Sequence, residues 1–305
     1  DDRDPKLIIR NAFARSGRIV QFVVASDEED SLNRQKIEHA VYDMYRQLGI
    51  TALMDTEQLK SYKLNDVACI GMHICTQIHN IRKKARFMPL YVSHELSTGR
   101  TRVQCDAFEK DNVSYRKACL EMAKLFWNED LEQLCVNASF SPAKQKLIEM
   151  KNHYDAESQG AVLLIHSDGN TRPLWGGISD KSISRYNIAN DYMPDQIDAG
   201  SGKTPYPISL SGTGVRIFRV RSNAEVPDYY TSAREDENYS SASGIFKYGK
   251  VFWAISQKPN DSKYNRSLKD SRFNYPFADY AEKDMIEIYP LQLQLDDDPS
   301  VWTKY

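Results

Sequence analysis

Residues 161–172, AVLLIHSDGNTR, combine the pattern of a buried strand with side chains that could do chemistry. The apolar run 161–165 is typical of a strand covered on both faces. Asp168 follows it, immediately before a Gly-Asn turn, where open α/β sheets place their sites. A carboxylate there could hold a hard cation against phosphate oxygens, and Arg172 could clamp a phosphate. Asp168 could equally do no more than cap the turn.

A second group of candidates is cationic. The stripe Val67, Ile70, Ile74, Ile78 and Ile81 predicts a helix over residues 66–84, which ends in a basic cluster containing Lys83 and Lys84. This cluster could bind phosphate, or it could only complement the helix dipole. A basic loop with interleaved aromatic residues begins at Lys258. Such a loop could follow a nucleic-acid backbone or could simply be solvated.

A third candidate lies in residues 215–221, VRIFRVR, which are expected to form a strand. Strand alternation places Arg219 and Arg221 on one otherwise apolar face. Arginines on such a face need a partner, and Glu225 is close by in sequence. The pairing could be purely structural.

Composition narrows the function classes. The chain has 305 residues and a net charge of −2, so no global basic field indicates nucleic acid. No apolar run is as long as a membrane span, and the start DDRDPK lacks a signal-peptide pattern, so we expect a cytoplasmic protein. The histidines, His73 among them, lack the spacing of a zinc motif and are interpreted as structural.

Alternating strands and helices are expected to position these residues. Residues 7–10, 18–25 and 50–54 have strand patterns around a helix over 31–48, which predicts a β-α-β unit with parallel strands. Residues 87–94 and 102–108 then predict an antiparallel pair, followed by helices over 115–127 and 143–153 and the strand at 161. That order is ribonuclease-H-like. A hairpin over 243–257 and a strand over 285–295 complete the chain.

Several segments resemble one protein family. LLIHSDGNTR resembles the strand-plus-Asp-Gly segment of Argonaute and PIWI proteins, RIVQFVVASDEEDSLNRQKIEHAVYDMYRQLGITAL is similar to the preceding MID domain, and MPLYVSHE resembles the first PIWI strand. The succession DGNTRPLW, VRIFRVRSNAEVP, GKVFWAISQKP and IEIYPLQLQLDDDPSVW resembles the prokaryotic branch named for a shared arginine and glutamate, pPIWI-RE. The resemblance covers essentially the whole chain. It implies an α/β fold, with a Rossmann-like MID domain over residues 1–85 and an RNase H-like PIWI domain with a mixed sheet over 86–305.

The resemblance also implies roles for individual residues. Asp168 matches a metal-binding carboxylate, and either Arg172 or Arg221, with Glu225, is a candidate for the signature pair. Lys83 and Lys84 match the region of a MID helix near the guide 5′-phosphate. Alternative phosphate ligands are Arg34 and Lys36.

One position departs from the slicing members of the family. Their first PIWI strand carries an aspartate where our alignment places Tyr91. Two-metal cleavage needs several carboxylates that hold Mg²⁺ or Mn²⁺ ions about 4 Å apart. Glu95 and Asp106 lie nearby in sequence but are poorly placed, so slicing is not expected.

The resulting hypothesis is a module that grips a guide strand, an RNA–DNA hybrid or an R-loop in prokaryotic defence against invading DNA. A helicase and a separate nuclease would be its partners. One alternative is an active RNase H-like endonuclease, in which Glu225, Asp106 or Glu95 joins Asp168 around Mg²⁺ or Mn²⁺. A second alternative is a scaffold that binds only proteins.

Overall fold

A computed structural model of the chain describes residues 5–23, 30–50, 56–62, 64, 66–77, 86–125, 141–155, 160–167, 169, 171–187, 196–201, 204–222, 225–227, 229–232, 244–255, 280–283, 285–294 and 296–304. Four of the candidate residues lie outside these ranges: Lys83, Lys84, Asp168 and Lys258.

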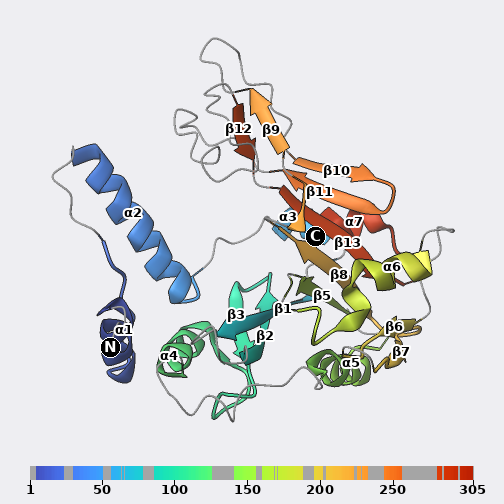
Figure 1. Cartoon of the computed structure of the whole chain (residues 1–305), viewed down its shortest axis with the longest axis horizontal. Helices are drawn as coiled ribbons and strands as arrows, with labels where there is room; N and C mark the ends of the chain where they lie inside the picture. Colours follow the sequence, from blue (N-terminus) through green and yellow to red (C-terminus); the bar gives the residue numbers. More distant parts are fainter. Residues whose placement is uncertain are drawn as a thin grey trace.

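A mixed sheet of nine strands forms the centre of the molecule (Figure 1). Its strands are β1 (Ala68–Gln77), β2 (Arg86–Glu95), β3 (Arg100–Gln104), β4 (Val113–Ser114), β5 (Ala161–His166), β8 (Val215–Arg221), β10 (Gly244–Tyr248), β11 (Val251–Ile255) and β13 (Met285–Gln292). Their order across the sheet is β10-β11-β13-β8-β5-β1-β2-β3-β4. Two small sheets pair β6 (Gln196–Asp198) with β7 (Pro207–Ser209), and β9 (Tyr229–Ser232) with β12 (Tyr280–Lys283).

Three adjacent strands, β1, β5 and β8, run parallel. On one side of them, β2 and β3 continue from β1 as an antiparallel meander. On the other side, β13, β11 and β10 add an antiparallel extension, whose last two strands form the predicted hairpin. The predicted α/β class with a mixed sheet is therefore confirmed. Because parallel neighbours end at the same edge of a sheet, the carboxyl ends of β1, β5 and β8 meet.

The helix predicted over residues 66–84 is wrong, because residues 68–77 form β1. The apolar residues Ile70 and Ile74 fit a helical stripe, but Ile70, Met72 and Ile74 also alternate, and all three are buried in the core. Pairing on both edges, with β2 and β5, decides the outcome. Residues 87–94, expected to be the first strand of the second domain, therefore lie in β2, the second strand of the meander.

The described part of the amino-terminal region is helical, with α1 (Pro5–Arg15), α2 (Asp30–Gln47) and α3 (Thr56–Ser61). The helix predicted over 31–48 corresponds to α2. The strand predicted over 7–10 is wrong, because these residues lie in α1, and residues 18–23 form no strand. A short apolar run does not distinguish strand from helix. The Rossmann-like arrangement expected of this region is not confirmed.

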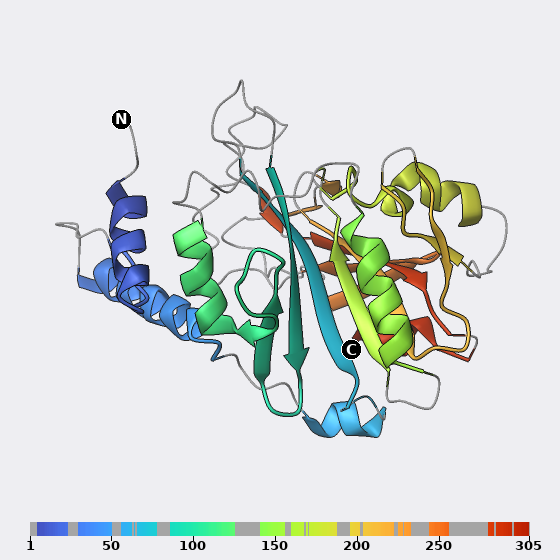
Figure 2. The same cartoon turned by 90° about the horizontal axis from the view of Figure 1, so that it is seen from below.

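Helices cover both faces of the sheet. Figure 2 shows α1, α2 and α4 (Tyr115–Leu125) on one side of the central strands and α5 (Pro142–His153) on the other. Three further helices are η2 (Gly176–Ile178), α6 (Asp180–Asn187) and α7 (Pro299–Lys304), of which α7 packs Trp302 in one cluster with Val162 of β5 and Phe218 of β8. No helix in the described ranges is long and apolar enough to cross a bilayer.

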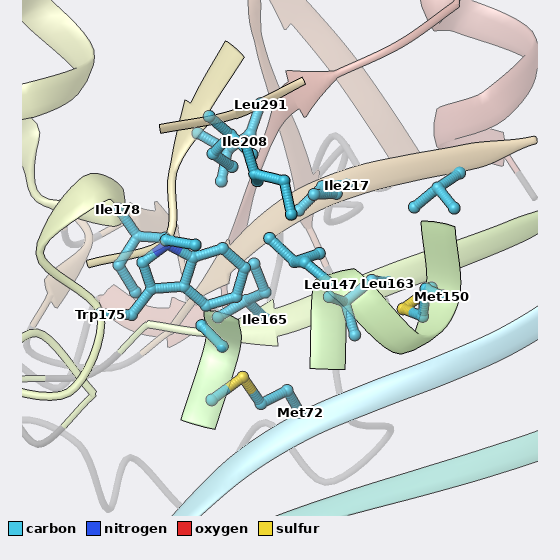
Figure 3. Close-up of a cluster of buried hydrophobic side chains, with 14 of the residues drawn as sticks. Met72, Leu147, Met150, Leu163, Ile165, Trp175, Ile178, Ile208, Ile217 and Leu291 are labelled. Carbon is cyan, nitrogen blue, oxygen red and sulfur yellow. The ribbon is translucent and has the colours of Figure 1, made fainter. Parts of the chain in front are cut away.

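The main core lies between the sheet and α5 (Figure 3). Ser141 caps α5 by accepting a hydrogen bond from the Lys144 N–H, and Pro142 begins the helix. The helix then packs Leu147 and Met150 onto Leu163 of β5. This packing fixes β5 up to its carboxyl end, which the candidate residues follow.

We predict that Leu147→Ala lowers the free energy of unfolding by about 2–5 kcal/mol, because it leaves a cavity under the sheet. Leu147 is fully buried, whereas the next residue, Ile148, is 37% exposed. Ile148→Ala is therefore the matched control and should change stability much less. Urea unfolding followed by circular dichroism measures both. Equal losses of stability for the two variants would contradict the packing of α5.

Candidate functional site

The carboxyl edge of the three parallel strands brings together residues that are far apart in sequence. Met72 of β1 pairs with Ile165 of β5, and His166 pairs with Val220 of β8. The next residue of β1, His73, is therefore beside His166. The edge thus contains two imidazoles, and the chain turns away from the sheet just after His166.

The two histidine rings face each other. Their Nδ1 atoms are 3.1 Å apart, and the ring centroids are 5.2 Å apart with the planes tilted by 33°. Sequence reasoning missed this pair because it placed His73 on a helix. The alternation of Ile70, Met72 and Ile74 was the signal that could have placed His73 on a strand, pointing away from the core.

Short hydrogen bonds fix the end of β5. The Ser167 N–H donates to the Val220 carbonyl at 2.8 Å, and the Thr171 hydroxyl donates to the His166 carbonyl at 2.7 Å. The Ser167 hydroxyl oxygen is buried and has no hydrogen-bond partner among the described residues. The backbone at the end of β5 is thus tied to β8 through Ser167.

Arg172 and Glu225 meet beside this turn. They form an ion pair, with the two side chains 39% and 31% exposed. Of the two pairings predicted for Glu225, the structure contains the one with Arg172. At this exposure the pair orients its two side chains and contributes little to stability.

Arg221 has different partners, which it shares with Arg219. Glu287 of β13 accepts from Arg219 Nη2 at 2.9 Å and from Arg221 Nε at 2.7 Å. Asp180 of α6 accepts from Arg219 Nη1 at 2.7 Å and from Arg221 Nη1 at 3.1 Å. Arg219 and Glu287 are buried, whereas the Asp180 side chain is 65% exposed. The shared face of the two arginines was predictable, but Glu287, far along the chain, was not.

The arginines also set the protonation of Asp180. Burial would raise the pKa of its carboxyl, but hydrogen bonds and charges from Arg219 and Arg221 outweigh burial and lower that pKa below its ordinary value. The stability that Asp180 contributes is therefore present above its ordinary pKa and is lost as the pH falls through the lowered one.

The remaining described candidates, Arg34 and Lys36, lie on α2, away from the strand ends. Arg34 forms an exposed ion pair with Glu38 at 3.4 Å.

A cavity of about 830 Å³ lies between the amino-terminal helices, α4 and the sheet. His73 lines it on the sheet side, and Arg10, Arg18 and Arg46 line it on the other. Asp43 adds one negative charge to this lining and pairs with Arg46 at 3.2 Å. The rest of the lining is mostly apolar, so the charged side chains of this cavity are three arginines and one aspartate, and the cavity reaches His73 of the histidine pair. Within the described ranges, no three His, Cys, Asp or Glu side chains form a group that could hold a metal ion.

We predict that Glu287→Gln lowers the free energy of unfolding by about 3–5 kcal/mol, because it removes the buried carboxylate between the two guanidinium groups and leaves them only the exposed carboxylate of Asp180. Asp180→Asn removes the exposed partner of the same two arginines, so it should cost about 1 kcal/mol or less. Chemical denaturation at neutral pH compares the two. A larger loss of stability for Asp180→Asn would contradict the buried role of Glu287.

Comparisons with known proteins agree with this arrangement. A family model described as the RNaseH domain of pPIWI_RE matches residues 69–305, and one described as the MID domain of pPIWI_RE matches residues 1–55. No curated protein matches the chain. The first match alone spans most of the chain and includes all nine strands of the large sheet except the first residue of β1. The chain therefore belongs to the pPIWI-RE family, with a MID domain followed by an RNase H-like domain.

Proposed function

We propose that this protein binds a guide strand or an RNA–DNA hybrid at the seam between its MID and RNase H-like domains and does not cut it. The proposal that the strand is not cut rests on one observation, the identity of the side chain on β1 beside the end of β5. That side chain is the imidazole of His73, 3.1 Å from His166.

RNase H-like domains commonly use Mg²⁺ or Mn²⁺, and the donors at this edge that belong to the described residues do not fit such ions. Hard cations take oxygen ligands, and two-metal cleavage needs several carboxylates. The sequence of β1, ACIGMHICTQ, contains neither aspartate nor glutamate. A site with imidazoles in place of carboxylates lacks the donors that this chemistry requires.

The other carboxylates that could support cleavage either form an ion pair or lie away from the end of β5. Glu225 forms an ion pair with Arg172. Glu95 ends β2, which is antiparallel to β1, so it lies at the edge opposite His166. Asp106 follows β3, two strands away from β1. Tyr91, expected at the position of the first aspartate, is on β2 and donates its hydroxyl to the Pro142 carbonyl at 2.9 Å.

Binding is supported by the arginines that line the cavity at the seam. Arg10, Arg18 and Arg46 come from the amino-terminal region and His73 from the sheet. Guanidinium groups in a concave surface suit a phosphate backbone, which supplies affinity while base pairing supplies sequence specificity. Arg172, which follows β5, would be a further phosphate ligand in this proposal if a phosphate replaced its present partner Glu225.

The wider role rests on the family resemblance. We propose a cytoplasmic function in defence, with RNA–DNA hybrids or R-loops as targets and a helicase and a separate nuclease as partners. The domain division at residue 85 remains a prediction, and the pairing of β1 within the large sheet favours a division before Ala68.

We predict tighter binding to a 5′-phosphorylated strand than to the same strand with a 5′-hydroxyl. Affinity should fall linearly with the logarithm of salt concentration, because bound phosphates release counterions. Fluorescence anisotropy with labelled strands at several salt concentrations measures both effects. A chain that binds neither strand would favour the protein scaffold.

We further predict that Lys83→Ala with Lys84→Ala weakens binding of all sequences alike. The salt slope should fall by about one for each phosphate that the variant no longer neutralises. The control is Lys247→Ala with Lys250→Ala, which removes equal charge at the β10–β11 hairpin. Unchanged affinity after the first double substitution would remove the assignment of these lysines as the phosphate anchor.

The absence of cleavage is tested directly with a labelled RNA–DNA hybrid in Mg²⁺ or Mn²⁺, with an active ribonuclease H in parallel. We expect no product from the wild-type chain or from Asp168→Asn. Metal-dependent cleavage that Asp168→Asn abolishes would establish the endonuclease alternative instead.

A further inference from the structure

The histidine pair at the ends of β1 and β5 has a geometry of its own. The two imidazoles directly follow the paired residues Met72 and Ile165 of parallel strands, and their Nδ1 atoms are 3.1 Å apart. We propose that His73 and His166 chelate a late first-row transition-metal ion, of which Zn²⁺ is the model case. This site uses nitrogen donors and is independent of whether the chain binds nucleic acid.

The separation of the nitrogens fits chelation. With Zn–N bonds of about 2.0–2.1 Å, two nitrogens 3.1 Å apart subtend roughly 100° at the ion, between the octahedral and tetrahedral angles. The same separation also permits a hydrogen bond between the two rings if one of them donates. An ion can bind instead when both rings are neutral and each carries its proton on Nε2, because both Nδ1 lone pairs are then available as ligands.

The strands hold both ligands in position before any ion arrives. β1 is paired on both edges, with β2 and β5, and β5 is paired with β1 and β8. The neighbouring side chains Met72, Ile74 and Ile165 are buried in the core. The Thr171 hydroxyl ties down the His166 carbonyl. Ligands on rigid, packed strands lose little conformational freedom on binding.

The donor type selects the class of ion. Imidazole suits Zn²⁺, Cu²⁺ and Ni²⁺, whereas Mg²⁺ prefers oxygen ligands and keeps much of its water. His73 lines the cavity between the two domains, which gives an ion a route to the pair. Two protein ligands leave coordination positions for water or for a phosphate oxygen. If a nucleic-acid backbone lies at the seam, as proposed above, a bound dication would be a point of attraction for it.

The test is metal titration of the full chain without nucleic acid, after removal of any polyhistidine tag. Isothermal titration with Zn²⁺ gives stoichiometry and affinity, and the visible absorption of Co²⁺ reports nitrogen ligation. We expect one ion per chain. His73→Ala and His166→Ala should each weaken binding at least about tenfold, because losing even an outer-shell partner of a metal ligand typically costs 10–100-fold. Mg²⁺ at the same concentration should not compete.

Two further variants keep the test decisive. His39, exposed on α2, is the matched control, and His39→Ala should bind metal like the wild type. His73→Gln keeps a polar side chain of similar size on β1, so it separates loss of metal binding from loss of fold, which circular dichroism monitors. The proposal is overturned if the wild type binds no ion, if the double variant of His73 and His166 binds equally well, or if Mg²⁺ displaces the ion.

Discussion

The hydrogen bonding of β1 between β2 and β5 determines what lies at the functional edge of this protein. Because β1 runs parallel to β5, its residues reach the same edge as the turn that follows His166. Parallel pairing of adjacent strands carries the register of one strand to the next, so the side chain beside His166 is set by the backbone. In this chain that side chain is an imidazole. The chemistry available at the edge follows from one residue type at one register position.

A second constraint is the need to neutralise charged side chains beside the core. Two arginines on neighbouring positions of one face of β8 would be costly to bury alone. Glu287 and Asp180 neutralise them, one from within the sheet and one from the start of α6. The ion cluster thus joins β8, β13 and α6, and it leaves Arg172 and Glu225 as a separate, more exposed pair at the end of β5.

Much of this architecture was predictable from the sequence, and the exceptions have physical causes. The apolar run of β5, the alternation of β8 and the helical pattern of α2 gave correct elements because each has a clear period. β1 was misassigned because its isoleucines fit both periods, and only tertiary pairing chooses between them. The contact between Arg172 and Glu225 was one of two pairings that the family resemblance suggested, and no pattern in the sequence chose between them. The partners of Arg221 and the meeting of His73 with His166 depend on contacts between distant segments, which no local pattern contains.

The position of Glu287 between Arg219 and Arg221 has a consequence for folding. Side chains alternate along β13, so a slip of one residue against β8 would turn Glu287 to the opposite face of the sheet. Both guanidinium groups would then lose their buried carboxylate and keep only the exposed one of Asp180, at a cost of several kcal/mol. Misaligned pairings of these two strands are thereby destabilised, so the ion cluster favours the native register between β8 and β13.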